Sequence, residues 1–384
     1  MKKLIRTATV SVSLDILLKG QLAFLNDYYQ VIAVSGQDVH LENVKKREKV
    51  LTVDVSMYRT ISPFKDFVSL VKLYLLFKKE KPLIVHSITP KAGLVSMAAA
   101  FFAGVPIRIH TFTGLLFPHK KGFLHHLLLF LDKVLCRFAT TIFPEGEGVK
   151  KDLENFKVTK KPLKVIANGN VNGIDLDFFN PNKVSQDEQE NLKQQLHIDG
   201  TDFVFVFVGR LVSDKGINEL VAAFTDLSKE NSHCKLLLVG PYENELDSLQ
   251  QETLDLITSN KSIISVGFQD DIRPYLSLSD VFVFPSYREG FPNVVLQAGA
   301  MNLPCIVTDI SGSNEIILQD ENGIIVPIKN KKAIFDGLNT MLLDVELRNK
   351  CKFNARHLIS SRYEQSQVWN SLLKEYQILE EKLK

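Results

Sequence analysis

Residues 281–301 combine an apolar run, a charged turn and a helical pattern, an order that few protein folds accommodate. Val281-Phe-Val-Phe284 is continuously apolar and β-rich, which is typical of a parallel strand covered on both faces. The charged turn Pro285-Ser-Tyr-Arg-Glu-Gly-Phe-Pro292 follows at once, and Asn293–Met301 has a helical pattern. This order aims unpaired backbone N–H groups and the positive end of the helix dipole at the carboxyl edge of a sheet. Open α/β sheets bind phosphorylated ligands at that edge, so we expect the turn to hold an anion.

Strands and helices alternate along most of the chain. The opening residues 1–12 read as a first strand, because Arg6 and Asp15 interrupt any signal-peptide core. Further strands are predicted over 31–34, 83–86, 107–111, 141–144, 164–167, 203–208, 235–239, 263–266, 281–284, 304–307 and 324–326. Helices are predicted near 20–26, 64–79, 93–103, 121–138, 217–224 and 293–301. Such alternation predicts an α/β protein with doubly wound parallel sheets.

The 384 residues suffice for two domains. Turn-forming residues are dense between Ala167 and Asn182, and after Asn354 only a helical pattern remains. We therefore predict a first domain over 1–168, a linker over 169–182, a second domain over 183–354 and a C-terminal helix over 355–384.

The two halves of the chain carry charge of opposite sign, which the net charge of +2 conceals. Before Asp175 there are 26 Lys/Arg against 13 Asp/Glu, and from Asp175 onward there are 20 against 31. A basic half suits nucleic acid, anionic lipid headgroups or a diphosphate, and charge alone does not choose among them. The four scattered cysteines have no metal-ligand spacing, which favours a reducing cytosol, and no apolar stretch is long enough to span a bilayer.

Further loops in the second half could bind an anion. Gly209 ends a predicted strand and allows close approach of a ligand to the backbone. Arg210 and Lys215 share the following loop, so both can reach one diphosphate, although a surface Arg and Lys at a helix start would look the same. The loops that begin at Gly240 and near Gly267 also open at strand ends. Several such loops at one sheet edge favour nucleotide binding.

These residues resemble family 4 glycosyltransferases, also called group 1. The resemblance is carried by Val208-Gly-Arg with Asp214-Lys-Gly, by 280–295, by Pro304–Glu315 and by Asn322–Pro327. It spans nearly the whole chain and is most specific in the second half, while the first half is similar to bacterial enzymes of capsular, O-antigen and other lipid-linked polysaccharides. It implies the GT-B fold, in which two Rossmann-like domains face a cleft and a C-terminal helix crosses back to the first domain.

The resemblance also implies a donor site in the second domain. The family signature is a Glu, seven residues and a second Glu; here Glu289 matches the first, and Gln297 stands at the second. Glu289 is expected to hold the donor sugar. Gln297 is expected to bind the ribose through hydrogen bonds of its uncharged amide. Arg210 and Lys215, with the backbone near Phe291, are expected to stabilise the departing nucleoside diphosphate. The full set of donor-binding residues is Gly209, Gly240, Phe291, Pro292, Asn293, Val294 and Gln297.

No cofactor and no metal are expected in this scheme. Asp175-Leu-Asp177 fits the Asp-x-Asp motif of metal-dependent transferases. It lies in the predicted linker and not at a strand end of a donor domain, so we interpret it as a coincidence.

Four residues of the first half are candidates for the acceptor cleft: Gly20, His110, Thr113 and Glu145. Gly20 is placed in the first strand-to-helix region. Many relatives have a His in a pattern like aromatic-Thr-x-His-Gly, and here Thr113 stands at the position of that His. His110, three residues earlier, is either a substitute for it or a structural histidine. Glu145 follows a predicted strand, where a solvated turn is an equal alternative.

The segment 119–137 is basic, aromatic and strongly apolar. It reads as a helix lying in the membrane interface, or as a buried core helix with a basic end.

The function predicted from these residues is a retaining glycosyltransferase that moves a hexose or N-acetylhexosamine from a nucleotide sugar, UDP-linked by likeness, to a lipid-linked (polyprenyl diphosphate) glycan. It would work in the cytoplasm, peripheral to the anionic inner face of the cell membrane, with no nucleic-acid partner. A UDP-sugar epimerase and a non-catalytic nucleotide-sugar-binding subunit are the alternatives. An oxidoreductase is excluded, because no Gly-x-Gly-x-x-Gly follows the first strand.

Overall fold

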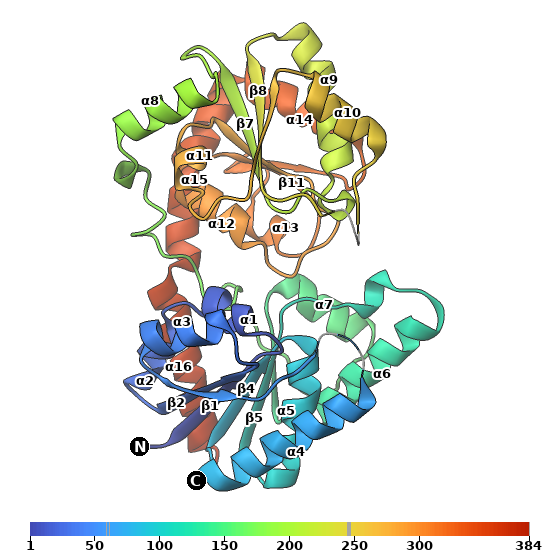
Figure 1. Ribbon diagram of the computed structural model, residues 1–384, viewed down its shortest axis with the longest axis vertical. Coiled ribbons are helices and arrows are strands. Elements are labelled where there is room, and N and C mark those ends of the chain that lie inside the picture. The colour runs from blue at the N-terminus through green and yellow to red at the C-terminus, as the bar shows by residue number, and fades with distance from the viewer. Residues whose placement is uncertain (59, 61, 244–246, 384) are drawn as a thin grey trace. The chain divides into compact units, whose positions relative to one another are not determined.

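A computed structural model describes residues 1–58, 60, 62–243 and 247–383, which form two compact units. The first unit is Met1–Gly173 together with the C-terminal segment from Gln365, and the second is Ile174–Glu364 (Figure 1). Among the described helices, none combines the length and apolarity needed to cross a bilayer.

The first unit is built on a six-stranded sheet in which the described pairings are all parallel. Its strand order is β3-β2-β1-β4-β5-β6. The strands are β1 (Lys3–Thr7), β2 (Gln30–Ser35), β3 (Leu51–Asp54), β4 (Ile84–Ile88), β5 (Ile107–Phe112) and β6 (Thr141–Pro144). This is the doubly wound arrangement predicted from the alternation of strands and helices.

Helices cover both faces of this sheet, as Figure 1 shows. One face packs on α4 (Pro63–Glu80), α5 (Pro90–Ala103) and α6 (Gly122–Phe138), the other on α1 (Ser11–Leu17), α2 (Gln21–Asn26), α3 (Val39–Glu48) and α16 (Gln365–Glu381). The remaining helices are η1 (Phe117–His119) and α7 (Glu147–Asn155). Ile5 and Val85 point to the first face, while Leu4 and Ile84 point to the second, as period-two alternation requires.

The C-terminal helix α16 belongs to the first unit. Leu372, Leu373 and Tyr376 are buried in the same cluster as Leu4 of β1. Trp369 donates a 2.7 Å hydrogen bond from Nε1 to Asn172 Oδ1, which ties the start of α16 to the segment that leaves the unit. The predicted return of a C-terminal helix to the first domain is confirmed.

The second unit repeats the architecture. Its parallel sheet has the order β12-β11-β10-β7-β8-β9. The strands are β7 (Phe203–Val208), β8 (Cys234–Val239), β9 (Ile263–Gly267), β10 (Val281–Phe284), β11 (Cys305–Thr308) and β12 (Gly323–Val326). The helices are η2 (Pro181–Lys183), α8 (Gln186–Gln195), η3 (Ser213–Lys215), α9 (Ile217–Glu230), α10 (Gln251–Ser259), α11 (Arg273–Ser277), α12 (Asn293–Ala300), α13 (Ser313–Ile316), α14 (Lys331–Leu343) and α15 (Val345–Tyr363).

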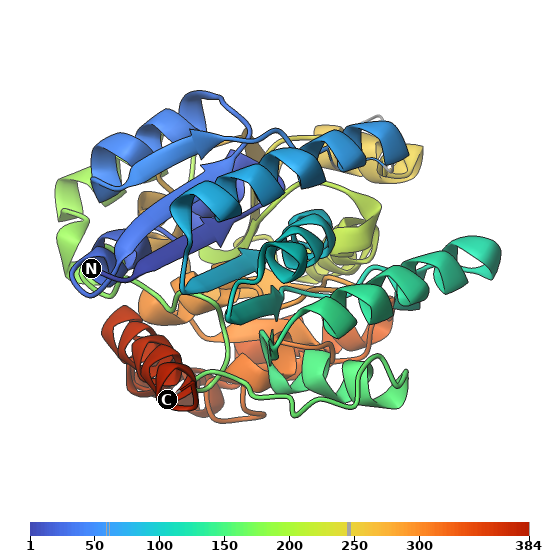
Figure 2. The same ribbon diagram turned by 90° about the horizontal axis from the view of Figure 1, so that it is seen from below.

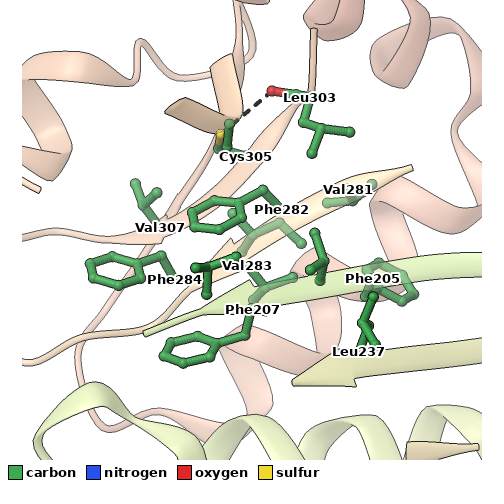
Figure 3. Packing of buried hydrophobic residues seen from close by; sticks show 14 of the residues in the cluster. Phe205, Phe207, Leu237, Val281, Phe282, Val283, Phe284, Leu303, Cys305 and Val307 are labelled. Carbon is green, nitrogen blue, oxygen red and sulfur yellow. Dashed lines mark hydrogen bonds between the residues drawn. The ribbon is translucent and has the colours of Figure 1, made fainter. Parts of the chain in front are cut away.

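The central strands of this second sheet carry its core. Phe205, Phe207, Phe282 and Phe284 are at most 1% exposed, and Figure 3 shows them on the neighbouring strands β7 and β10. The rings of Phe207 and Phe284 stack with their centroids 5.9 Å apart. Each buried phenyl group stabilises the fold by about 1.5–3 kcal/mol. The apolar run Val281–Phe284 is therefore a strand with both faces buried, as predicted.

The structure divides the chain differently from the predicted boundaries. Ile174 and Phe179, placed in the linker, are buried in the core of the second unit, where Arg356 donates to the carbonyl oxygen of Phe179. The predicted tail helix 355–384 is two helices, and the last turns of α15 remain in the second unit because Ile359 packs on Gly299 of α12.

Two predicted elements also need correction. Residues 164–167 are not a strand; the backbone beside them makes only an isolated bridge between Leu163 and Ile142. The edge strand β3 was not predicted, because none of its four residues is fully buried and it lacks an apolar run.

Candidate functional site

Three loops at the carboxyl edge of the second sheet, those after β7, β8 and β10, pack backbone against backbone. Gly240, after β8, has φ +149°, and a Cβ there would lie 1.8 Å from the carbonyl oxygen of Gly209. Gly216, after β7, has φ +70°, and a Cβ there would lie 2.1 Å from the carbonyl oxygen of Pro285 after β10. Only glycine fits such contacts. Gly209 and Gly240 therefore bring the loops together, in addition to the access to a ligand expected for them.

Lys215 and Glu289 meet where the loops after β7 and β10 join. Lys215 Nζ donates to Glu289 Oε1, and each side chain is 18% exposed. Ser286 Oγ donates to the same carboxylate oxygen at 2.9 Å. Lys215 Nζ also lies 5.2 Å from the ring centroid of Phe284. Two predicted residues thus form one partly buried polar cluster, held by a serine to which the sequence analysis assigned no role.

Arg210 lies on the same loop but has another partner. Its guanidinium pairs with Glu243, from the loop after β8, and its side chain is 56% exposed. Leu211 and Tyr242 form a parallel bridge beside this pair. Arg210 and Lys215 therefore both present cations at the edge, and each is in contact with a carboxylate.

A third ion pair, between Arg288 and Asp214, fixes the turn that precedes α12. Arg288 Nε donates to Asp214 Oδ2 at 2.9 Å, and the amide of Tyr287 donates to the Asp214 carbonyl oxygen at 2.8 Å. Tyr287 OH donates to Glu219 at 2.6 Å, and burial together with this carboxylate raises the pKa of Tyr287. Asp214 and Arg288 belong to the family motif, but no role was predicted for them. Their contacts hold the turn before α12 in place.

Within the described residues, the N-cap position of α12 supplies no side-chain hydrogen bond to the helix. Asn293 and Val294 occupy its first turn, whose backbone N–H groups point towards the amino end of the helix. Pro292 is the N-cap residue and has no N–H to donate, and Phe291 is 6% exposed and packs on Tyr363, so neither side chain offers a polar contact. Gln297 lies one turn further on and is half-buried.

On the first sheet, Thr113 and Glu145 directly follow β5 and β6 at the carboxyl edge. Gly20 does not lie in the turn after β1, because α1 begins at Ser11 and Gly20 falls between α1 and α2. It has φ +82°, and a Cβ there would lie 2.7 Å from Trp369. Its amide donates to Glu48 at 2.9 Å, so packing explains this glycine.

His110 is fully buried. The ring sits over Gly93, where a Cβ would lie 2.4 Å from Cε1, and Nδ1 is 2.9 Å from Ser87 Oγ. Burial lowers the pKa of His110 to about 3, so the imidazole is neutral. These contacts favour the structural alternative for His110. Asp175 likewise has a local role, since Oδ1 accepts from the amides of Asp177 and Phe178 and closes a turn.

The chain matches two family descriptions: "Glycosyl transferase 4-like domain" over residues 28–169 and "Glycosyl transferases group 1" over residues 188–358. It is 32% identical to the capsular polysaccharide biosynthesis glycosyltransferase CapM of Staphylococcus aureus, across 97% of this chain and 96% of the relative. It is 31% identical to the UDP-Gal:alpha-D-GlcNAc-diphosphoundecaprenol alpha-1,3-galactosyltransferase of Escherichia coli, across 79% and 77%.

Solved structures share the fold. Anabaena Alr3699/HepE in complex with UDP superposes with a TM-score of 0.81 at 18% identity, covering 98% of this chain and 100% of that one. A glycosyltransferase from Rickettsia africae gives a TM-score of 0.81 at 20% identity, covering 98% of both chains.

Two Rossmann-like units, together with the two family matches, define a glycosyltransferase of the GT-B class. The 32% identity to CapM, over nearly the full length of both chains, shows the family more specifically. The chain belongs to the group 1 glycosyltransferases, as its motifs predicted.

Proposed function

We propose that this enzyme transfers a hexose or N-acetylhexosamine from a UDP-sugar, with retention of anomeric configuration, to a sugar carried on a polyprenyl diphosphate. The observation that carries the proposal is the cluster of Lys215, Glu289 and Ser286 directly before α12, with the Arg210–Glu243 pair on the same sheet edge. The E. coli relative, named for UDP-galactose and a diphosphoundecaprenol acceptor, supports this donor and acceptor, and CapM supports a place in surface polysaccharide synthesis.

The chemistry is assigned to these residues as follows. The bond between the anomeric carbon and the UDP oxygen breaks, and its electron pair leaves with the diphosphate. Lys215, Arg210 and the amides of the first turn of α12 stabilise the negative charge that develops there. Glu289 holds hydroxyls of the donor sugar near the reacting carbon, and Gln297 binds the ribose. The acceptor hydroxyl attacks from the face that UDP leaves, and its proton passes to the departing phosphate oxygen. Protein cations supply the charge stabilisation, so we propose no metal and no cofactor.

The acceptor suggests work at the cytoplasmic face of the cell membrane, and α6 is the proposed contact. Its first three turns contain no fully buried residue, although most of their side chains are apolar. Figure 2 shows the helix extending away from the sheet of the first unit. Phe123 is 81% exposed and Phe130 is 60% exposed. Lys120, Lys121 and Lys133 lie in or beside this helix, which favours anionic lipid. The exposed side chains weigh against the buried-core alternative for this segment.

The nucleotide and the stereochemistry can be tested together. UDP and UDP-sugars should raise the melting temperature more than GDP- and ADP-sugars, because a ligand that binds only the native state stabilises it. The NMR spectrum of the product should show the anomeric configuration of the donor. Stabilisation by another nucleotide alone, or an inverted product, would overturn the corresponding part of the proposal.

A further inference from the structure

Helix α4 of the first unit turns an apolar stripe towards solvent. Its fully buried residues, Ser69, Leu73 and Phe77, all lie on the side that faces the core. The opposite side has exposed apolar side chains about once per turn, and these are Phe64, Phe67, Val68, Val71 and Leu75. Single exposed apolar residues are ordinary, but a continuous stripe marks an interaction surface.

The exposed charges of α4 are all positive. They belong to Lys65, Lys72, Lys78 and Lys79. The two carboxylates of the helix are less exposed, and each is already paired: Asp66 lies 2.5 Å from Lys91 Nζ, and Glu80 lies 2.8 Å from Lys3 Nζ. The surface of α4 therefore combines an apolar stripe with ammonium groups, and its acidic groups are neutralised from within the first unit.

A polar aromatic residue lies beside the amino end of the stripe. Tyr58 is 43% exposed, and Lys65 Nζ lies 4.3 Å from the centroid of its ring. A tyrosine ring with one apolar and one polar end is favoured at the depth of lipid headgroups. The 18 residues of α4 make a helix about 27 Å long, enough to lie along a bilayer surface.

The charges discriminate between the partners that such a stripe could contact. If α4 packed on α4 of a second copy, the lysines of the two helices would lie close together, and like charges at short distance oppose association. Nucleic acid would pair with the lysines but leave the apolar stripe in water. An anionic bilayer suits both features, because its phosphates attract the lysines and its acyl region accepts the apolar side chains.

We propose that α4 lies in the interface of an anionic bilayer, with Phe64, Phe67 and Leu75 in the acyl region and its lysines among the headgroups. This surface adds a second helix to the contact proposed for α6, and α5 lies between the two helices and packs on both (Figures 1 and 2). The inference rests on the proposed function for its biological reason, an acceptor carried on a polyprenyl lipid. Two linked contacts hold a protein at a membrane more firmly than one.

Flotation of the full-length enzyme with phosphatidylglycerol vesicles tests the surface. Phe67→Ser should bind the vesicles roughly 10–100-fold more weakly, because a phenyl group no longer enters the lipid. Lys72→Gln should bind about fivefold more weakly and depend less on salt. Phe353→Ser, on α15 and 86% exposed, is the matched control and should bind like wild type. All three positions are exposed, so the melting temperatures should equal that of the wild-type enzyme.

A fluorescent probe locates the helix without removing a phenyl group. The four native cysteines are buried, so an environment-sensitive nitrobenzoxadiazole label reacts selectively with Leu75→Cys. Its emission should shift to the blue and increase when phosphatidylglycerol vesicles are added. Leu343→Cys is the matched control, because Leu343 is a leucine at the end of α14 that is 65% exposed against 59% for Leu75. The emission of this label should stay unchanged.

The outcomes separate the surface from the reaction. Unchanged emission at position 75, or wild-type flotation of Phe67→Ser, would overturn the α4 contact whatever the transfer activity. Self-association of the wild-type enzyme that Phe67→Ser abolishes would overturn it in favour of a second copy. Lipid-dependent emission at position 75 in an enzyme that transfers no sugar would refute the proposed function but support this surface.

Discussion

Lys215 Nζ donates a hydrogen bond to Glu289 Oε1 and so joins the loop after β7 to the loop after β10. A diphosphate held by Lys215 would compete with Glu289 for the same ammonium group. The two residues are therefore coupled, yet their proposed partners differ: Lys215 binds phosphate, and Glu289 binds the sugar. Their variants should separate nucleotide binding from turnover.

Glu289→Ala should abolish most turnover without weakening UDP binding. Loss of an interaction used in the transition state reduces kcat by about 10²–10³-fold. The Kd for UDP should stay equal or fall, because the competing carboxylate is gone. Calorimetry with UDP and steady-state kinetics measure the two effects, and wild-type turnover in this variant would contradict the role of Glu289.

Lys215→Ala should weaken both UDP binding and turnover. A charge-assisted hydrogen bond contributes about 1.5–3 kcal/mol, so the Kd for UDP should rise roughly 10–100-fold. Lys229→Ala is the control, since Lys229 lies on α9 of the same unit, is paired with Asp226 and is 69% exposed. Equal UDP affinity in the Lys215 variant and the control would show that Lys215 does not hold the diphosphate.

Gln297→Glu tests the residue that departs from the family signature. A carboxylate accepts hydrogen bonds from a ribose diol more strongly than an amide does, by about 1 kcal/mol, so the KM for the donor should fall about fivefold. Donor kinetics at constant acceptor concentration give the answer. An unchanged or higher KM would place Gln297 away from the ribose.

The sequence was most informative where local pattern and tertiary burial agree. β7 and β10 were predicted with their observed bounds, because both are buried on two faces and therefore apolar throughout. The motif around Glu289 could be read in the same way, since strand, turn and helix are contiguous in the chain.

Long-range contacts explain the failures. Gly20 looked like a ligand-binding glycine, but it is Trp369, distant in the sequence, that excludes a side chain there. The burial of Arg6 gave no signal in the sequence, because its partners His86 and Tyr376 lie 80 and 370 residues away. The pairing of Arg210 with Glu243 could not be predicted from the sequence for the same reason. Parallel strands bring together the ends of segments that are separate in the sequence.

Asp132 should make stability depend on pH. Burial in α6 raises the pKa of this carboxyl from 3.8 to about 7. Between these values the folded state holds a proton that the unfolded state has released, so the free energy of unfolding falls as pH rises through this window, by up to ~4 kcal/mol. Asp132→Asn removes this loss, and should be more stable than wild type at pH 8 and similar at pH 4.

Urea unfolding at the two pH values measures this effect. Asp27→Asn, an exposed aspartate in the first unit, is the control and should keep the wild-type pH dependence. An Asp132 variant whose stability falls with pH as steeply as the wild type would show that Asp132 is ionised in the native state at neutral pH.

Phe123→Ser and Phe130→Ser test the membrane contact of α6. Burying a phenyl group in lipid contributes about 1.5–3 kcal/mol, so each variant should bind anionic vesicles roughly 10–100-fold more weakly. Flotation with phosphatidylglycerol vesicles is the assay, with phosphatidylcholine vesicles for comparison. Phe353→Ser, on α15 and 86% exposed, should bind like wild type. No flotation of the wild-type enzyme with either lipid would refute the contact.

Transfer to a polyprenyl-diphosphate-linked sugar tests the central claim most directly. The purified enzyme is incubated with a UDP-sugar, with and without an acceptor bearing N-acetylglucosamine on a diphosphate lipid, and UDP and the acceptor mass are followed. The account predicts UDP release that depends on the acceptor, a product heavier by one sugar residue, and the loss of both in Glu289→Ala. An acceptor of unchanged mass, with the UDP-sugar converted to its epimer or left intact, would contradict it.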